Sequence, residues 1–351
     1  MSAHKMTLVS GVRRWHTRMA LALGVAIAGG ALSVLLARLA LGSDWDFVEY
    51  RAPDAQDIPA AVAIAPDGAV WFTLESSDAV GVLRDGRIER VPRGGETLEA
   101  LGLAVDARGN VWVTDISGQA IAQLRPDGTR ELVRIPGPLA QLGRLSIAPD
   151  GSVWFADSWG NSVTRLQDQR LEPHMAAEAN AAPFGVAVDH DGVIWATLQL
   201  ANKLMRIDPS GAVTELDVPT RNAAPTDIAI DPLGGVWFTE LRANKIVRFA
   251  DGRFSEFSAP AEAPGLTSLA IGPDGSVWFT ELRRQRLARL RNGSFTEFAL
   301  RRPDARPFGV AAAASGDVWY TDLSGWIGKL SAEQARADPL DFGRIIAWLR
   351  G

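Results

Sequence analysis

Short apolar runs recur along the chain at a fixed spacing, and each recurring unit contains a tryptophan at the same place. The residues that mark the period are Trp71, Trp112, Trp154, Trp195, Trp237, Trp278 and Trp319. Successive members are 41 or 42 residues apart, and a period of this size is typical of stacked or radial repeat proteins. Each unit holds four runs of β-branched, aromatic and aliphatic residues without apolar positions at helical spacing. The sequence therefore predicts seven four-stranded antiparallel units.

Asp-Gly and Asn-Gly pairs separate the predicted strands within a unit. In the sixth unit, Asp274-Gly275 follows the first run and Asn292-Gly293 follows the third. Such pairs are strong signals for two-residue hairpins of type I′, in which both central residues have positive φ. We therefore expect both turns to be type I′ hairpins.

The apolar runs around the tryptophans, such as Val70-Trp71-Phe72, are continuous rather than alternating, which indicates sheets that are covered on both faces. Radial packing around an axis, as in a β-propeller, covers every sheet in this way. A linear stack of the same units would need polar caps at both ends. We predict an all-β fold, a seven-bladed β-propeller of four-stranded antiparallel blades, over residues 44–330.

The two ends of the repeat array complement each other. The seventh unit stops after Leu330 without a fourth run, and Phe47-Val-Glu-Tyr50 near the N-terminus matches the fourth run Phe254-Ser-Glu-Phe257 of another unit. We therefore expect the N-terminal strand to complete the last blade and to close the ring. Closure also removes exposed sheet edges.

A basic segment and an apolar segment precede the predicted propeller. Residues 1–18 are basic, and residues 19–41 form a mostly apolar stretch of the length that a membrane-spanning helix needs. The positive charges place residues 1–18 in the cytoplasm and the propeller on the periplasmic side of a bacterial-type inner membrane. Two alternatives stay open, namely a single-pass anchor or a signal segment cleaved after Gly42, which would leave a secreted protein.

Residues 331–351 follow the propeller and are expected to form a short helical tail. Ser331 and Gln334 have the spacing of an N-terminal capping box, and Asp338-Pro339 would end the helix. We expect this tail to pack on the propeller; contact with the membrane is the alternative.

Charge is unevenly distributed along the 351 residues. The net charge is −5, but residues 1–43 carry five basic and no acidic side chains, so the remainder holds 31 basic and 41 acidic ones. An acidic body is unsuited to neutralising phosphates, which argues against nucleic acid as a partner. The chain has no cysteine, which excludes disulfides and thiolate metal sites. We expect a monomer.

Two rings of residues are expected at one mouth of the axial channel, where loops enter the innermost strands and leave the second strands. The first ring lies three residues after each tryptophan, and its five carboxylates are Asp115, Asp157, Glu240, Glu281 and Asp322. Oxygen ligands of this kind suit Mg²⁺ or Ca²⁺. Because basic and amide residues follow in the same loops, local ion pairs and turn hydrogen bonds are the alternative role.

The second ring lies eleven residues before each tryptophan and is apolar apart from two hydroxyls. Phe184 and Phe308 belong to repeated Pro-Phe-Gly sequences, and Thr226 and Thr267 supply the hydroxyls. Together with Arg306 on the same face, these residues are the predicted binding site for a small molecule or a protein. The alternative is that the aromatic rings only plug the channel.

None of the four histidines is expected near the axis. His4 and His16 lie before the apolar segment, whereas His174 and His190 are expected in an outer strand and a hairpin turn. The chain also lacks a nucleophile elbow, a zinc-protease motif, a phosphate loop and a dinucleotide fingerprint. No catalytic residue can therefore be assigned from local motifs.

The repeated phrase Pro273-Asp-Gly-Ser-Val-Trp-Phe-Thr-Glu281 and the segment Asn244-Lys-Ile-Val-Arg248 resemble the streptogramin (virginiamycin B) lyase family. The resemblance extends over about residues 45–330 and implies a seven-bladed propeller. Characterised members linearise a cyclic depsipeptide antibiotic by elimination, with magnesium assisting a histidine base.

The resemblance also identifies the positions where the family keeps its active-site residues. Glu281 matches the metal-binding glutamate. Thr226 and Thr267 stand where the family has two histidines, and Gly265 stands where it has another glutamate. A threonine hydroxyl cannot replace an imidazole as general base near neutral pH.

Two functions follow from these residues. The first is a membrane-tethered or exported propeller that binds a ligand or a protein on its channel face without turnover. The alternative is an enzyme, either a divergent lyase or a metal-dependent lactone hydrolase acting on a cyclic ester or depsipeptide. It would use Glu281 with other carboxylates of the first ring around Mg²⁺ or Ca²⁺.

Overall fold

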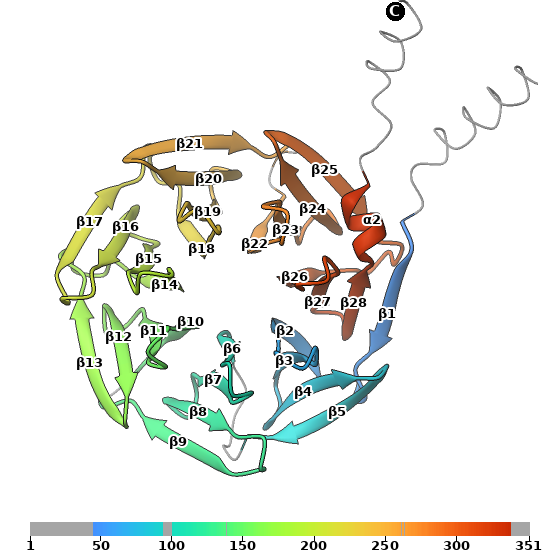
Figure 1. Cartoon of the computed structure of the whole chain (residues 1–351), viewed down its shortest axis with the longest axis horizontal. Helices are drawn as coiled ribbons and strands as arrows, with labels where there is room; N and C mark the ends of the chain where they lie inside the picture. The colour runs from blue at the N-terminus through green and yellow to red at the C-terminus, as the bar shows by residue number, and fades with distance from the viewer. Residues whose placement is uncertain (1–44, 94–99, 138, 261, 263, 338–351) are drawn as a thin grey trace, which may run out of the picture. The chain divides into compact units, whose positions relative to one another are not determined.

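The computed structural model describes residues 45–337 except 94–99, 138, 261 and 263. In this part of the chain, seven four-stranded antiparallel sheets surround a common axis, which confirms the predicted seven-bladed propeller (Figure 1). We number the blades from β2 onward, so that blade 1 contains β2 to β5 and blade 7 contains β26 to β28 and β1.

Each blade runs outward from the axis. The innermost strands are β2 (Ile58–Ile64), β6 (Leu103–Val105), β10 (Leu142–Ile147), β14 (Pro183–Val188), β18 (Pro225–Ile230), β22 (Leu266–Ile271) and β26 (Pro307–Ala312). The second strands are β3 (Val70–Glu75), β7 (Val111–Asp115), β11 (Val153–Asp157), β15 (Ile194–Leu198), β19 (Val236–Glu240), β23 (Val277–Glu281) and β27 (Val318–Asp322).

The outer half of each blade completes the sheet. The third strands are β4 (Ala79–Arg84), β8 (Ala120–Leu124), β12 (Ser162–Gln167), β16 (Lys203–Ile207), β20 (Lys245–Ala250), β24 (Arg286–Arg291) and β28 (Trp326–Leu330). The outermost strands are β5 (Arg87–Pro92), β9 (Arg130–Arg134), β13 (Arg170–Met175), β17 (Val213–Asp217), β21 (Arg253–Ser258), β25 (Ser294–Ala299) and β1 (Phe47–Arg51).

The N-terminal strand closes the ring, as predicted. β1 pairs antiparallel with β28, with Phe47 opposite Leu330 and Tyr50 opposite Ile327. Two aromatic contacts support this pairing, because Phe47 meets Tyr320 edge-on at 5.6 Å and Tyr50 stacks on Trp319 at 6.2 Å. Blade 7 is thus built from both ends of the propeller sequence (Figure 1).

The turns are of two kinds, and one differs from the prediction. Asn292 and Gly293 have φ of 51° and 77°, which confirms a type I′ hairpin between β24 and β25. Between β22 and β23, however, Gly275 has φ of 76° while Asp274 does not have positive φ. The type I′ prediction for Asp274-Gly275 was wrong because the Asp274 carboxylate accepts the Ser276 N–H at 3.1 Å, which holds a longer turn.

A threonine two residues after most repeat tryptophans joins neighbouring blades. The Thr197 hydroxyl accepts the Gly185 N–H of its own blade at 2.9 Å and donates to the Thr226 carbonyl of the next blade at 2.6 Å. Thr321 makes the same two bonds, to the Gly309 N–H and the Ala60 carbonyl, across the closing junction. These buried hydroxyls give partners to backbone groups near the axis, where the sheets meet.

The repeat tryptophans pack between adjacent blades. Those of blades 1, 3, 4, 5 and 6 are buried, and those of blades 2 and 7 are partly exposed. Trp237 illustrates the usual surroundings, because Phe257 stacks on it at 5.8 Å and the Arg248 guanidinium lies 5.7 Å from its ring centre. The Trp237 indole is therefore flanked by residues from the third and fourth strands of its own blade, whereas Phe249 of the next blade covers Trp195.

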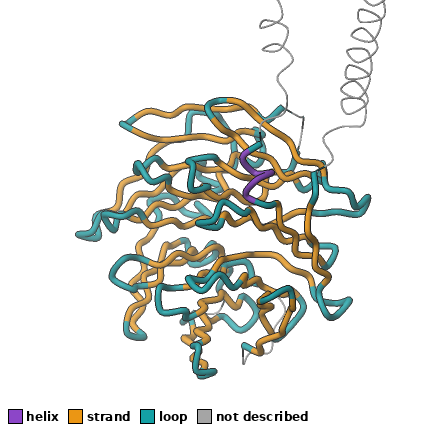
Figure 2. The backbone as a smooth tube through the Cα atoms, turned by 45° about the vertical axis from the view of Figure 1, so that its right-hand side comes forward, coloured by secondary structure: helices purple, strands orange, loops and turns teal. Residues whose placement is uncertain are grey.

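The predicted C-terminal helix is present as α2 (Ala332–Arg336), which Figure 2 shows in purple among the strands. Ser331 caps it by accepting the Gln334 N–H at 3.4 Å. The Gln334 side chain accepts the Asp46 N–H at 2.9 Å, so it holds the start of β1 instead of completing a reciprocal capping box. The Ala335 carbonyl accepts from Arg289, which packs the helix on blade 6 as expected.

Several predictions for the ends of the chain fall outside the described residues. They concern the basic segment 1–18, the apolar segment 19–41 and the part of the tail beyond residue 337. Within the described part of the chain, no helix has the length and apolar character needed to cross a membrane.

Candidate functional site

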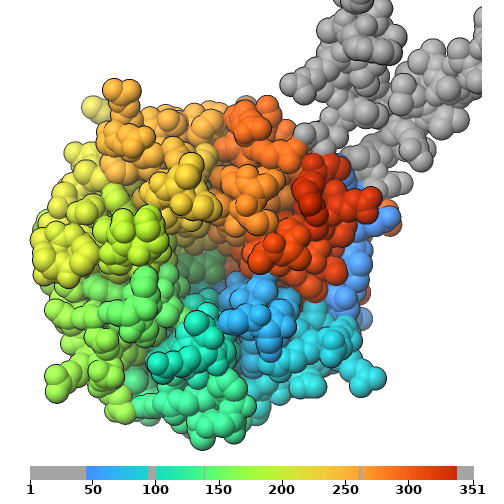
Figure 3. All heavy atoms as spheres, in the orientation of Figure 1, coloured from blue at the N-terminus to red at the C-terminus, as the bar shows by residue number. Residues whose placement is uncertain are grey.

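The inner strands converge on the axis, and the face seen in Figure 3 is hollowed at this point. In blade 4 the pairing of β14 with β15 shifts register between Pro183 and Val186. In blade 7 the same shift separates Pro307 from Val310. Such bulges re-aim side chains, and they contain Phe184 and Phe308, the two predicted aromatic residues. Both are partly buried at the channel end of their strands.

The two threonines that stand where the family has histidines form hydrogen bonds with neighbouring residues. Thr226 donates to the Ala224 carbonyl at 2.9 Å and accepts from Gln199 at 3.2 Å. Thr267 lies 2.9 Å from both the Phe308 carbonyl and the Thr280 hydroxyl. Their hydroxyl groups thus stabilise the contacts between blades and are not set up to remove a proton from a ligand.

An ion pair that the sequence analysis missed lies beside these residues. Arg144 of blade 3 and Asp227 of blade 5 approach to 3.6 Å between Nε and Oδ1, and the Phe308 ring of blade 7 lies 5.8 Å from the guanidinium. Blades 3, 5 and 7 are not neighbours in the ring, so these side chains meet across the channel. Arg144 Nη1 also donates to the Leu101 carbonyl at 2.9 Å, and Asp227 Oδ2 accepts the Leu269 N–H at 2.9 Å.

The guanidinium of Arg144 is incompletely satisfied. Its Nε and Nη2 are buried and have no hydrogen-bond partner in the part of the chain that the structure describes. Leaving buried donors unpaired costs free energy. A ligand that brings a carbonyl or carboxylate oxygen into the channel would remove this cost.

A sequence signal for the pair did exist. Arg144 and Asp227 lie ten residues before their repeat tryptophans, one position beyond the second ring. The other five residues of that position are small: Ala61, Gly102, Gly185, Ser268 and Gly309. Two oppositely charged residues among five residues with small side chains were the feature that the sequence could have revealed.

Three carboxylates of the first ring are held by local bonds. Asp157 accepts the N–H groups of Trp159 and Gly160 at 3.1 and 2.9 Å, which shapes its loop. Asp322 accepts from Arg302 at 2.6 Å, and it also accepts the N–H of Arg306, whose side chain is exposed at the rim. Asp115 accepts the N–H of Gly118, three residues further along the chain, at 2.7 Å.

The other two carboxylates, Glu240 and Glu281, are fully buried. All four of their oxygens lack a hydrogen-bond partner in the described part of the chain. Burial raises the pKa of each to about 7, helped by the nearby charges of Glu256 and Glu297 respectively. Each is therefore a carboxyl group that takes up a proton near neutral pH.

These carboxylates do not form a recognisable cation cage. Among the described residues, no group of three or more histidine, cysteine, aspartate and glutamate side chains is arranged to hold a metal ion. Arg286 pairs with Glu297, and Lys245 pairs with Glu256 at 2.7 Å, so cationic side chains already occupy the space beside Glu281 and Glu240. The Mg²⁺ or Ca²⁺ site stays a prediction.

The two histidines of the described propeller lie outside this site. His174 on β13 packs on Trp154 at 5.2 Å, and His190 lies 3.4 Å from Asp191 in an exposed turn. Both positions agree with the expectation of an outer strand and a hairpin turn.

Comparison with known proteins gives consistent results. The sequence model of the Virginiamycin B lyase family matches residues 36–196 and 244–338. A virginiamycin B lyase of Nocardia farcinica (strain IFM 10152) is 32% identical over 169 residues, which are 48% of this chain and 57% of that protein. The match thus spans little more than half of the curated relative.

Solved structures agree in fold. A streptogramin B lyase superposes with a TM-score of 0.78 at 25% identity, covering 81% of this chain and 97% of that one. A catalytically inactive virginiamycin B lyase from Staphylococcus aureus, in complex with quinupristin, has a TM-score of 0.78 at 24% identity and covers 82% and 99%. A more distant propeller, YCF48 bound to D1 peptide, has a TM-score of 0.66 at 12% identity, covering 84% and 98%.

Proposed function

Because the chain belongs to the virginiamycin B lyase family, we propose that its channel mouth binds a cyclic peptide or depsipeptide and leaves the ring of that ligand intact. The observation that carries the proposal is the Arg144 guanidinium next to the Phe308 ring, because two of its buried nitrogens have no hydrogen-bond partner in the described residues. A cyclic depsipeptide presents carbonyl oxygens between apolar side chains. Arg144 would take a carbonyl, and Phe308 and Phe184 would cover apolar groups.

The absence of turnover rests on the two threonines. Ring opening by elimination needs a base that contacts the ligand and accepts a proton near neutral pH. Glu240 and Glu281 have pKa values of about 7 but are fully buried. Thr226 and Thr267 stand where the family has histidines, and their hydroxyl groups are already bonded to Gln199 and to the Phe308 carbonyl of neighbouring blades. Binding without chemistry is therefore the function that this set of side chains supports best.

Quinupristin is a suitable probe because a related protein is known in complex with it. We expect calorimetric titration to detect binding to the intact protein. Arg144→Met keeps an unbranched aliphatic stem but removes the donors, so affinity should fall by roughly tenfold or more. Arg253→Met, on the exposed outer strand β21, is the matched control and should bind like the parent protein.

Chromatography with mass analysis of the same mixtures tests the absence of turnover. Elimination gives an isomer with unchanged mass and altered retention, whereas hydrolysis adds one water. Recovery of unchanged quinupristin supports the proposal. Failure to bind, equal binding by Arg144→Met, or conversion to a linear product would each overturn it.

The competing function is a metal-dependent lyase or lactone hydrolase, and one observation favours it. Glu281 stands at the position of the family's metal-binding glutamate, and both of its carboxylate oxygens lack a hydrogen-bond partner in the described residues. The described donor set does not fit a metal held by several protein ligands, so we assign no step to a metal ion. Thermal denaturation with EDTA against added Mg²⁺ or Ca²⁺ separates the two functions. A midpoint that rises with the metal, and no longer does so in Glu281→Gln, would support the enzyme.

We also propose that residues 19–41 are either an export signal or a membrane anchor. In both cases the propeller lies on the periplasmic side of the inner membrane. The support is the apolar stretch with basic residues before it. N-terminal sequencing of the mature protein distinguishes the two forms. A start at Ser43 indicates export with cleavage, an intact N-terminus in the membrane fraction indicates an anchor, and an intact soluble protein contradicts both.

A further inference from the structure

One repeat tryptophan lacks the cover that the others have. In the described part of the chain, the other six each have a cation or an aromatic ring against the indole: Arg84 on Trp71, His174 on Trp154, Phe249 on Trp195, Phe257 on Trp237, Phe298 on Trp278 and Tyr50 on Trp319. Trp112 of blade 2 has neither, and its indole N–H donates a hydrogen bond of 3.4 Å to Asp106.

The strand register explains the difference. The residue paired with Trp112 on β8 is Gln123, whereas blades 3 to 6 place an arginine at the corresponding position. The outer strand contributes Val133 opposite Ile121, where blades 5 and 6 contribute phenylalanines. Two local substitutions in the repeat thus remove both the cation and the ring that would cover the indole.

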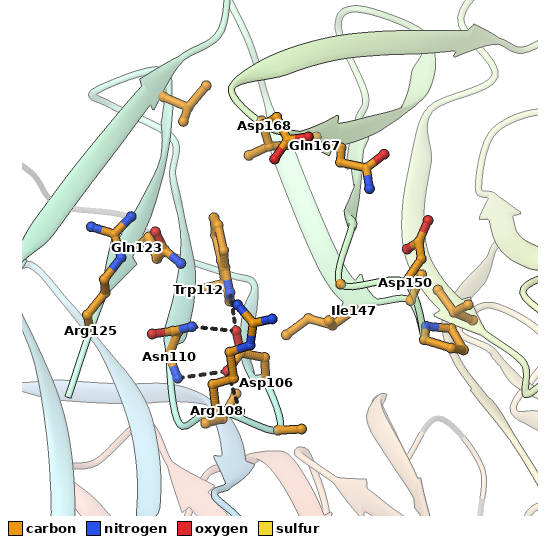
Figure 4. Close-up of a pocket in the computed structure, with 18 of the residues that line it drawn as sticks. Asp106, Arg108, Asn110, Trp112, Gln123, Arg125, Ile147, Asp150, Gln167 and Asp168 are labelled. Carbon is orange, nitrogen blue, oxygen red and sulfur yellow. Dashed lines mark hydrogen bonds between the residues drawn. The ribbon is translucent and has the colours of Figure 1, made fainter.

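A cavity of about 1050 Å³ lies where this cover is missing, between blades 2 and 3. Figure 4 shows Trp112, Asn110 and Gln123 on one wall and Ile147 and Gln167 on the other. Its lining includes the turns between the first and second strands and between the third and fourth strands. It therefore opens on the face opposite the channel mouth and is independent of the site described above.

The cavity continues on both sides. A second cavity of about 430 Å³ shares Arg108 and Arg125 with it, and a third of about 410 Å³ shares Asp150 and His190. The three together follow the blades along one face. Their combined outline suits an extended, chain-like ligand better than a compact one.

A neutral amide beside the Trp112 indole is among the polar groups left available in the cavity. Only 8% of Gln123 is exposed, it lines the cavity, and its side chain has no hydrogen-bond partner in the described structure. Two carboxylates of the lining are already engaged: Asp106 accepts from the Asn110 amide at 2.7 Å, and Glu131 accepts from Arg125 and Gln169 at 2.5 Å each. The Arg125 guanidinium offsets the charge of Glu131.

We propose that this cavity binds a neutral oligosaccharide, with one sugar ring against the Trp112 indole and its hydroxyls bonded to Gln123 and neighbouring amides. The C–H face of a sugar ring is apolar and packs on an indole, while each hydroxyl is both donor and acceptor. A glutamine amide offers both functions as well. The row of adjoining cavities provides space for further sugar rings.

The decisive variant restores the repeat. Gln123→Arg introduces the residue of blades 3 to 6 and should place a guanidinium over the Trp112 indole without disturbing the fold. Cellotetraose, maltotetraose and chitotetraose serve as probes in calorimetric titrations of the intact protein. We expect at least one to bind, and its affinity to fall by roughly tenfold or more in Gln123→Arg, as the loss of an aromatic contact implies.

Arg206→Gln in blade 4 is the control, because Phe249 still covers Trp195 there, and oligosaccharide binding should stay unchanged. Thermal denaturation checks that Gln123→Arg is folded, and its quinupristin binding should equal that of the parent protein. The proposal is overturned if none of the three tetrasaccharides binds at millimolar concentration, or if Gln123→Arg binds them unimpaired. It is equally overturned if tetramethylammonium, used as a cationic probe, competes for the cavity.

Discussion

Glu240 and Glu281 end the second strands of neighbouring blades, and burial decides their chemistry. The same residue type at the surface would be ionised at neutral pH, but both carboxyl groups are shielded from water and lack hydrogen-bond partners in the described structure. Burial favours the neutral form of an acid, and the charges of Glu256 and Glu297 add to this effect. Their protonation therefore depends on the fold.

The raised pKa of Glu240 predicts a pH-dependent stability. The folded state keeps the proton up to about pH 7, whereas the unfolded chain releases it near 4.5. The folded state binds more protons between these values, so the free energy of unfolding falls as pH rises from 4.5 through about 7. The full loss is on the order of 3 kcal/mol.

Glu240→Gln should remove this part of the pH dependence and be more stable than the parent protein at pH 8. Urea denaturation at pH 5 and pH 8 measures both effects. Glu89→Gln, on the exposed outer strand β5, is the control and should leave the pH dependence unchanged. If Glu240→Gln and the parent protein lose stability equally between the two pH values, Glu240 is not the group responsible.

At the level of single elements, the threonines of the second strands hold adjacent sheets together. Thr197 on β15 satisfies a donor of its own blade and an acceptor of blade 5 with one hydroxyl. Blade 3 has Ala156 in this place, and its inner strand carries the larger Arg144 ten residues before the tryptophan instead of a glycine. The departure from the repeat thus coincides with the blade that sends Arg144 into the channel.

Thr197→Val should destabilise the propeller although it preserves the shape of the side chain. The Gly185 N–H and the Thr226 carbonyl would lose a buried partner, at a cost of roughly 1–3 kcal/mol. Urea denaturation measures the loss. Thr214→Val on the exposed strand β17 is the matched control, expected to change stability by less than about 0.5 kcal/mol. Equal stabilities of the two variants would show that the hydroxyl does not join the blades.

At the scale of the whole molecule, ring closure depends on an arginine that joins the two ends of the propeller sequence. Arg302, in the loop before β26, bonds to Asp322 at 2.6 Å and to Glu49 of β1 at 3.1 Å. Its guanidinium also lies 4.8 Å from the Trp326 ring. Asp322 is fully buried, so this pair is shielded from solvent.

Arg302→Ala should therefore lower the free energy of unfolding strongly, by about 3–5 kcal/mol, because it leaves the Asp322 charge buried and unpaired. Arg301→Ala is the natural control. Arg301 pairs with Asp46 at 2.8 Å, but the two side chains are 59% and 74% exposed, so its loss should cost less than about 1 kcal/mol. Thermal and urea denaturation of both variants measure the difference, and similar losses would contradict a special role of Arg302 in closure.

The architecture was accessible from the sequence because it depends on contacts that repeat. The tryptophan period, the β-branched runs and the match between Phe47–Tyr50 and other fourth runs predicted seven blades and their closure, and all were confirmed. Hairpin turns were predicted less well, since the Asp274 side chain and not the Asp-Gly pair itself determined the first turn.

The candidate sites were only partly accessible. Sequence spacing placed Phe308 at the channel and Glu281 at the end of its strand, but it did not show that Arg144 and Asp227 meet Phe308 across the axis. Nor did it show that Trp112 lacks cover. Strand pairing within a blade joins residues close in sequence, so a periodic pattern predicts it. Contacts between non-adjacent blades, and the burial that shifts a pKa, exist only after the ring has closed.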